Sequence, residues 1–331
     1  MRVAVFDTHK FDREALEEAN QNKHDLHFFE ARLRLQTAPL AKGYDAVCCF
    51  ANDRADAETL KCLKEMGVRL LALRCAGYNQ VDLKSAKENG ITVVRVPEYS
   101  PYAVAEFAAG LLLSLNRKIH RAHNRVREMN FSLDGLVGFD LHNKSVGVVG
   151  TGRIGKVFAQ IMRGFGCNLL AYDLQPNLEW AKANEVQYVD LKELLHKCDV
   201  ISLHIPLSAG THHLIDENAF ELMKPGAIII NTGRGGLIKT KALIKALKSH
   251  SISGACIDVY EEEADVFFSD LSDVGIDDDQ LSRLLTFPNV LVTSHQAFLT
   301  REALNAIATI TIESIKRFEN QGDLKEVIIT Y

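Results

Sequence analysis

Short apolar runs alternate with longer amphipathic segments along the whole chain. In the first hundred residues the apolar runs fall at residues 2–7, 25–30, 46–50, 69–75 and 91–97. Strands that alternate with helices in this way form parallel sheets with helices on both faces. The pattern therefore predicts one small, doubly wound α/β domain with five strands.

The alternation restarts after Lys144 and predicts a second, larger parallel sheet. Its six apolar runs fall at residues 144–150, 168–173, 199–205, 226–231, 254–259 and 289–293. Two amphipathic helices, over residues 101–130 and from Arg301 onward, are expected to link the two sheets. We therefore expect a discontinuous first domain (residues 1–100 and 299–331), a second domain (residues 101–298) and a cleft at their junction.

Composition and charge narrow the classes of partner. The chain has 331 residues, 47% of them hydrophobic, which excludes a disordered protein. With 38 basic and 43 acidic side chains the formal net charge is −5, and no long basic stretch occurs. Nucleic acid and anionic membranes are therefore not the expected partners, whereas a small anionic metabolite could still meet a local arginine.

Cysteine usage and the chain's apolar segments indicate a cytoplasmic protein. The seven cysteines are an odd number without a C-x-x-C pair, and several lie inside apolar runs, as buried thiols in a reducing compartment do. The N-terminus begins as a strand and does not resemble a signal peptide. The most apolar helical segment, residues 103–115, is too short to span a bilayer, which needs about 20 apolar residues.

A glycine motif follows the first strand of the second sheet. Gly150, Gly152 and Gly155 form G-x-G-x-x-G between an apolar strand and an amphipathic helix. Such glycines allow a tight turn and the close approach of a pyrophosphate to a helix N-terminus. The next strand ends at Asp173, where a carboxylate can accept hydrogen bonds from a ribose and repel a 2′-phosphate. We expect NAD rather than NADP; the alternative is an ordinary glycine turn with a surface aspartate.

Other polar residues come at the carboxyl ends of the predicted strands, where open α/β sheets bind ligands. They include His204-Ile205-Pro206, Thr232-Gly233-Arg234, Asp258 and Ser294-His295. Alone, Arg234 would be a loop arginine, His295 a structural histidine and the acidic run 261–263 a solvated face. Together they supply what reduction of a keto acid needs: a cation for the carboxylate, an acid for the carbonyl oxygen and a carboxylate to keep that acid protonated. Composition does not choose among the three glutamates.

Two histidine pairs are weaker candidates. His120 and His123 are spaced for one helix face, and His212 and His213 are adjacent. Neither pair has a cysteine or carboxylate cluster at zinc-like spacing, so we interpret both as structural or solvated and expect no metal.

The motifs taken together resemble the D-isomer-specific 2-hydroxyacid dehydrogenase family over essentially the whole chain. VVGTGRIGK with Asp173, NTGRGGLI around Arg234, ACIDVYEEE and PNVLVTSHQAF around His295 occur in the family's order and spacing. DVYE-x-E, the Phe-rich acidic insertion and HQAFLT are most similar to the bacterial fermentative D-lactate dehydrogenases. The resemblance implies a Rossmann-type NAD domain and a smaller flavodoxin-like substrate domain.

The resemblance also implies roles for single residues. The family places its catalytic glutamate 29 residues after the arginine, which selects Glu263 from the acidic run. The implied catalytic residues are then Arg234, Glu263 and His295. Substrate contacts are expected at Ala76, Gly77, Tyr99, Arg234 and Phe298. Cofactor contacts are expected at Gly150, Gly152, Arg153, Ile154, Gly155, Asp173, Pro206, Thr211, Thr232, Gly233, Arg234 and Asp258.

The function implied is reduction of pyruvate to D-lactate with NADH, in a homo-oligomer built mainly through the NAD domain. His295 would protonate the keto oxygen, Glu263 would favour the charged imidazolium, and Arg234 would hold the carboxylate. Two alternatives stay open at this point. One is a dehydrogenase for a bulkier 2-keto acid, and the other is an NAD-sensing co-repressor, which shares the fold and these residues without turnover.

Overall fold

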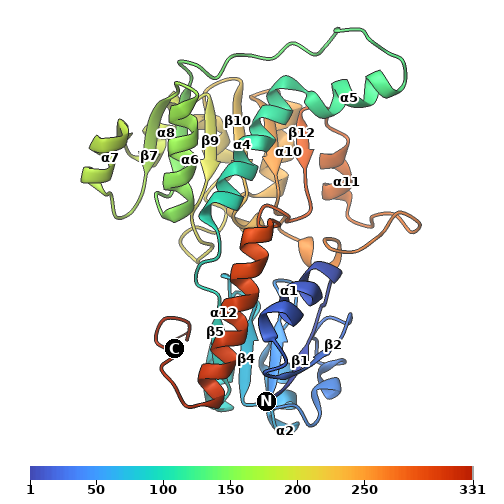
Figure 1. Ribbon diagram of the computed structural model, residues 1–331. Coiled ribbons are helices and arrows are strands. Elements are labelled where there is room, and N and C mark those ends of the chain that lie inside the picture. Colours follow the sequence, from blue (N-terminus) through green and yellow to red (C-terminus); the bar gives the residue numbers. More distant parts are fainter. Residues whose placement is uncertain (330–331) are drawn as a thin grey trace. The chain divides into compact units, whose positions relative to one another are not determined.

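Two units, each built around one parallel sheet, make up the chain in this computed structural model (Figure 1). The structure describes residues 1–329, with the side chain of residue 265 left out. The first unit comprises Met1–Ser100 and the C-terminal segment from Leu299 onward, and the second is Pro101–Phe298. Both sheets are parallel with helices on both faces, which confirms the predicted α/β class.

The five-stranded sheet of the first unit has the strand order β2-β1-β3-β4-β5, which is the flavodoxin-like order. Its strands are β1 (Arg2–Val5), β2 (Asp25–Phe28), β3 (Ala46–Cys49), β4 (Leu70–Leu73) and β5 (Thr92–Arg95). They coincide with the five predicted runs and are one to three residues shorter. The central strands β3 and β4 are buried along their whole length, because helices cover both faces of the sheet.

One face of this sheet carries α1 (Lys10–Asn20) and α12 (Arg301–Glu319), which pack against each other (Figure 1). The other face carries α2 (Ala57–Glu65), α3 (Leu83–Glu88) and the short 3-10 helix η1 (Ala38–Ala41). Apolar side chains such as Leu16 and Ile312 fill the first face, and Leu60 and Leu63 fill the second. The C-terminal helix is therefore part of the core of the first unit.

The sheet of the second unit has seven strands in the order β12-β11-β10-β9-β6-β7-β8. They are β6 (Ser145–Val149), β7 (Asn168–Tyr172), β8 (Val186–Tyr188), β9 (Val200–Leu203), β10 (Ala227–Asn231), β11 (Ile252–Ile257) and β12 (Val290–Val292). The strand order changes direction at β6, between β9 and β7, and the glycine motif follows β6. This is the topological switch point at which such sheets bind dinucleotides.

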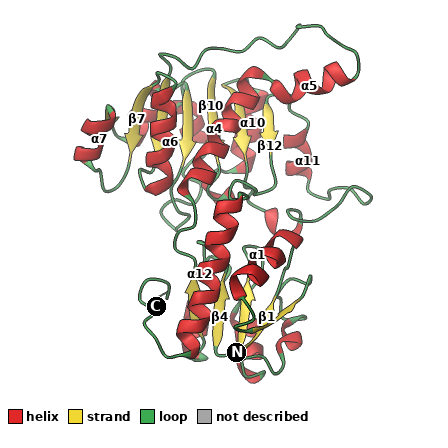
Figure 2. Cartoon of the chain, in the orientation of Figure 1, coloured by secondary structure: helices red, strands yellow, loops and turns green. Residues whose placement is uncertain are grey.

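Helices again cover both faces of the larger sheet (Figure 2). The helices are α4 (Pro101–Arg117), α5 (Ile119–Arg127), α6 (Arg153–Gly164), α7 (Leu178–Asn184), α8 (Leu191–Lys197), α9 (Glu217–Leu222), α10 (Thr240–Lys248) and α11 (Asp279–Leu285). Two 3-10 turns, η2 (Gly235–Leu237) and η3 (Glu263–Asp265), follow β10 and β11. Within the described chain, no helix combines the length and the apolarity needed to cross a membrane.

Two sequence predictions about the second unit were wrong. Six strands were predicted, and the seventh, β8, has only three residues, of which one is buried, so it carries almost no apolar signal. The helix predicted over residues 101–130 is two helices, because Lys118 adopts a left-handed conformation with φ of 52° and ends the first helix at Arg117. No glycine or proline marks this break in the sequence.

Candidate active site

The glycine loop after β6 has a shape that only glycine allows. Gly150 has φ of +96°, and a Cβ there would lie 2.6 Å from the carbonyl oxygen of His204. A Cβ on Gly155 would clash with the carbonyl oxygen of Gly150. The N-cap of α6 is Gly152, where a Cβ would meet open space and no side chain caps the helix. The loop therefore presents a helix N-terminus that an anion can approach.

Asp173, at the end of β7, also holds this loop in place. Its Oδ2 accepts hydrogen bonds from the backbone N–H of Thr151 (2.6 Å) and from its hydroxyl (2.9 Å), and Oδ1 accepts from the N–H of Gln175. Burial acts to raise the pKa of Asp173, but the hydrogen bonds from Gln175 and Thr151 outweigh it and hold the pKa below the ordinary value. An ionised acceptor beside the glycine loop is what a ribose diol requires.

Other predicted cofactor contacts lie at the neighbouring strand ends. Thr211 donates a hydrogen bond to the carbonyl oxygen of Pro206 (2.7 Å), which closes the turn after β9. The hydroxyl of Thr232, after β10, is buried without a hydrogen-bond partner in the structure. A buried polar atom of this kind is costly unless a ligand satisfies it. The open helix terminus, the ionised Asp173 and this hydroxyl together fit an NAD molecule.

His295 and Glu263 are joined by a side-chain hydrogen bond. The Nδ1 atom of His295 lies 2.6 Å from Oε1 of Glu263, and both side chains are about 15% exposed. The second oxygen of Glu263 accepts from the backbone N–H of Tyr260 at 2.9 Å, which fixes the carboxylate. The ring of Phe268 lies 6.0 Å from the imidazole, centroid to centroid. Within the described residues the Nε2 atom of His295 has no hydrogen bond, so it is available to a substrate.

The conformation of the His295 loop depends on Asp258, which directly follows β11. His295 has φ of +54°, an unusual value outside glycine. Its N–H donates to the carbonyl oxygen of Asp258 (2.7 Å), and the Asp258 carboxylate accepts from Thr293, Gln296 and Ala297. Burial raises the pKa of Asp258, although these hydrogen bonds oppose it. Asp258, predicted as a cofactor contact, is thus also the residue that holds the histidine loop.

Arg234 begins the loop after β10. The strands β10, β11 and β12 are neighbours in parallel register, with Asn231 beside Ile257 and Ile257 beside Val292. Their carboxyl ends, which carry Arg234, Asp258 and His295, therefore meet at one edge of the sheet. The Arg234 guanidinium is half-buried and donates to the carbonyl oxygen of Gly233 at 2.7 Å.

Sequence reasoning missed Gly235, which lets the arginine loop approach the glutamate loop. A Cβ on Gly235 would collide with the main-chain carbonyl of Tyr260 and the N–H of Glu261. The doubled glycine of NTGRGG is visible in the sequence, but no sequence pattern shows that it packs against the main chain at Tyr260. Thr293, whose hydroxyl donates to Asp258 at 2.6 Å, was also missed.

The three glutamates of the acidic run have three different environments. Glu261 pairs with His213 at 2.6 Å, and its other oxygen accepts from the N–H of Thr240 at the start of α10. Glu262 is exposed, and Glu263 pairs with His295. Another histidine at a strand end, His204, bonds to the hydroxyl of Ser202, and burial lowers its pKa to about 3, so it stays neutral at pH 7.

The remaining predicted substrate contacts are Ala76, Gly77, Tyr99 and Phe298. Ala76 and Gly77 follow β4 in the first unit, where Arg95 donates to the carbonyl oxygen of Ala76 at 2.8 Å. Tyr99 follows β5 and is half-buried. Phe298, in the second unit, is buried three residues after His295.

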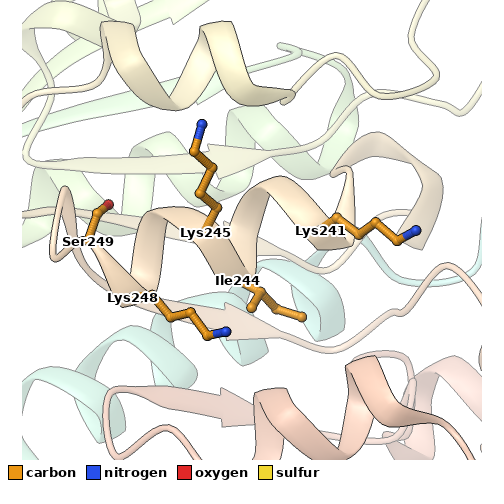
Figure 3. A pocket seen from close by; sticks show the side chains of 5 residues that line it. All are labelled: Lys241, Ile244, Lys245, Lys248 and Ser249. Atoms are coloured by element: carbon orange, nitrogen blue, oxygen red, sulfur yellow. The ribbon is translucent and has the colours of Figure 1, made fainter.

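A hollow of about 500 Å³ on α10 is separate from this edge of the sheet. It is lined by Lys241, Ile244, Lys245, Lys248 and Ser249 (Figure 3). The three lysine side chains point in different directions and do not converge on one position. None of the predicted site residues lines this hollow, and we do not assign it a ligand.

Comparison with known proteins agrees with the fold. Residues 109–297 match the family description "D-isomer specific 2-hydroxyacid dehydrogenase, NAD binding domain". The chain is 52% identical over 331 residues to 2-hydroxyacid dehydrogenase homolog 1 of Schizosaccharomyces pombe, covering 99% of both chains. It is 48% identical over 320 residues to the D-lactate dehydrogenase of Escherichia coli, covering 96% of this chain and 97% of that protein. A solved structure of the pyruvate reductase of Chlamydomonas reinhardtii superposes with a TM-score of 0.92 at 45% identity, covering 98% of each chain.

The sheet topology, the glycine loop and the matching NAD-binding domain define an NAD-dependent oxidoreductase. The chain belongs to the D-isomer specific 2-hydroxyacid dehydrogenase family. The predicted family, fold class and cofactor are therefore confirmed.

Proposed function

We propose that this protein is an NAD-dependent D-lactate dehydrogenase that reduces pyruvate to D-lactate in a reversible reaction. The observation that carries the proposal is the His295–Glu263 pair of 2.6 Å at the strand edge that also carries Arg234. Relatives named D-lactate dehydrogenase and pyruvate reductase, similar over the full length, support pyruvate as the substrate.

The catalytic residues have distinct tasks in this proposal. Bound NADH supplies the hydride that C2 of pyruvate receives. Protonated His295 donates its Nε2 proton to the keto oxygen, and Glu263, which accepts from Nδ1, orients the ring and stabilises its positive charge. The Arg234 guanidinium gives up its hydrogen bond to the carbonyl oxygen of Gly233. It then binds the substrate carboxylate through two parallel hydrogen bonds.

The predicted binding residues complete the proposal. Residues 101–298 form the NAD-binding domain, and residues 1–100 with 299–331 form the substrate domain. Gly150, Gly152, Arg153, Ile154 and Gly155 would hold the pyrophosphate, Asp173 the adenosine ribose, and Pro206, Thr211, Thr232, Gly233, Arg234 and Asp258 the nicotinamide half. Ala76, Gly77, Tyr99 and Phe298 are the proposed further substrate contacts. The pair of hydrogen bonds from Thr151 to Asp173 supports the ribose assignment, because it keeps the acceptor ionised beside the loop.

We also propose a cytoplasmic homo-oligomer. All seven cysteines are free, and most are buried, as in proteins of reducing compartments. None of the residues of α5 is buried, and the segment after it exposes Met129, Phe131, Leu133 and Val137 to between 68% and 84%. In Figure 1 this segment extends away from the rest of the second unit. A second copy of the chain is the proposed cover for these apolar side chains. Phe131→Asp with Leu133→Asp should then reduce the mass measured by light scattering.

A substrate panel tests the proposed function. NADH oxidation would be measured with pyruvate, 2-ketoisocaproate and phenylpyruvate, and the chirality of the product determined. We expect the highest kcat/KM with pyruvate and the D-isomer as product. Preference for a bulky keto acid would overturn the pyruvate assignment. NADH binding without turnover of any keto acid would favour the NAD-sensing co-repressor.

A further inference from the structure

A second histidine–carboxylate cluster lies beside the arginine and glutamate loops, separate from the His295–Glu263 pair. It comprises His212, His213 and Glu261, whose ligand atoms all lie within 4.8 Å of one another. The Nε2 atom of His213 is 2.6 Å from Oε1 of Glu261. This is the one group of three or more potential metal ligands that lies so close together among the described residues.

The local backbone brings two adjacent histidines to the same side of the chain. His213 adopts φ of +53°, and the two imidazole rings stack with centroids 3.8 Å apart. The N–H of His213 donates to the carbonyl oxygen of Gly236 at 2.7 Å, which ties this turn to the loop after Arg234. Glu261 reaches the pair from the loop after β11, 48 residues along the chain. This separation is why sequence spacing gave no sign of the third member.

A purely structural role explains only part of this cluster. The hydrogen bond between His213 and Glu261 and the bond from Thr240 to Glu261 satisfy these two side chains as a link between the turn and the start of α10. They do not account for His212. Its side chain is exposed, stacks on His213, and makes no hydrogen bond within the described chain. Two imidazoles and one carboxylate are a ligand set that zinc and similar divalent ions prefer.

We propose that His212, His213 and Glu261 bind one Zn²⁺ or a similar divalent transition-metal ion. Metal–ligand bonds of about 2.0–2.2 Å in a tetrahedral site place the ligand atoms about 3.3 Å apart. The His213–Glu261 distance must therefore open from 2.6 Å, and the wider distances in the cluster must close from up to 4.8 Å. The exposed His212 can rotate to do this, and water completes the coordination. The ion replaces the proton that His213 and Glu261 share.

Zinc binding should also lower turnover, and this part rests on the proposed function. Glu261 and Glu263 belong to the same short loop, and Gly235 of the arginine loop packs against its main chain. A shift of Glu261 by a fraction of an ångström is therefore passed to Glu263 and to its hydrogen bond with His295. Catalysis is sensitive to displacements of this size. We expect zinc to decrease kcat for pyruvate with little effect on NADH binding.

Binding is measured first and does not depend on activity. The intact protein is titrated with Zn²⁺ by calorimetry and with Co²⁺ by visible absorption, which reports four-coordinate nitrogen and oxygen ligation. We expect one ion per chain and at least a tenfold weaker affinity in His212→Gln. This exposed side chain lacks hydrogen bonds, so the variant should fold. His123→Gln, in the other histidine pair of the sequence, is the matched control and should bind like the wild type.

The outcomes separate the metal site from the reaction. Equal zinc affinity in wild type and His212→Gln, or no saturable binding in the wild type, would overturn the site. Zinc inhibition that persists in His212→Gln would assign the inhibition to another group, such as the His295–Glu263 pair, and overturn the coupling. If the protein reduced no keto acid, the proposed function would fail while the calorimetric and Co²⁺ results still decided the metal site.

Discussion

Glu263→Gln provides a direct test of how the His295 proton is held. The variant keeps the size of the side chain and an acceptor for the backbone N–H of Tyr260, but it replaces a charged partner of His295 by a neutral amide. The pair is 2.6 Å long, and its members are 16% and 15% exposed, so solvent screens it little. The variant should therefore lose the charged partner that orients the imidazole and stabilises the positive charge that pyruvate reduction requires.

The size of the effect follows from the difference between charged and neutral hydrogen bonds. A hydrogen bond to a charged group contributes about 1.5–3 kcal/mol, and one between neutral groups about 0.5–1.5 kcal/mol. The difference of about 1.3 kcal/mol corresponds to a factor of about 10 in rate. The value of kcat/KM for pyruvate, measured at one fixed pH, should thus fall about tenfold in Glu263→Gln.

The assay is kcat/KM for pyruvate reduction, at one fixed pH, in three single variants. Glu262→Gln is the matched control, because Glu262 is exposed one position away. Glu261→Gln replaces the carboxylate that bonds to His213 and that accepts from the N–H of Thr240, so it should destabilise the start of α10. An unchanged kcat/KM in Glu263→Gln, or an equal fall in Glu262→Gln, would refute the reasoning.

Four further substitutions test the other parts of the site. His295→Gln should reduce kcat by about 10²–10⁴ while NADH binding, measured by fluorescence, stays near normal; wild-type turnover would mean that another group supplies the proton. Arg234→Lys should raise KM for pyruvate and lower kcat, because an ammonium cannot make two parallel bonds, and unchanged kinetics would contradict the bidentate contact. Asp173→Ser should weaken the binding of NADH and reduce the preference for NADH over NADPH, measured as the ratio of the two kcat/KM values. A constant ratio would place the adenosine ribose elsewhere. Gly235→Ala should lower kcat/KM about 10²-fold, because its Cβ meets main-chain atoms, whereas Gly236→Ala meets only side chains and should be milder; equal effects would argue against the loop contact.

Strands buried on both faces were the easiest part of the fold to predict. The runs at β3, β4 and β10 are apolar at nearly every position, since helices cover both sides of each sheet. The short edge strand β8 lacks this pattern, because only Val186 of its three residues is buried. The end of α4 was equally unpredictable, because no sequence signal marks the left-handed conformation of Lys118. Local propensity cannot reveal elements whose bounds are set by tertiary contacts.

The candidate site was also only partly predictable from the sequence. Its residue types and its sheet edge could be predicted, because parallel strands bring their carboxyl ends together. The partner of each glutamate could not, since Glu263 meets His295 across 32 residues and Glu261 meets His213 across 48. Only the family resemblance selected Glu263, through its distance from Arg234. The acidic run itself gives three equal candidates.

The extension of β11 organises all three proposed catalytic residues. Asp258 holds the loop that carries His295, and the N–H of Tyr260 holds Glu263. The main chain at Tyr260 also packs against Gly235, directly after Arg234. These contacts are possible because β11 lies between β10 and β12 in the sheet, so its extension faces both neighbouring loops. The geometry of the acid, its carboxylate and the cation thus depends on one short segment, which explains why residues with no contact to the reacting atoms, such as Gly235, are expected to affect turnover.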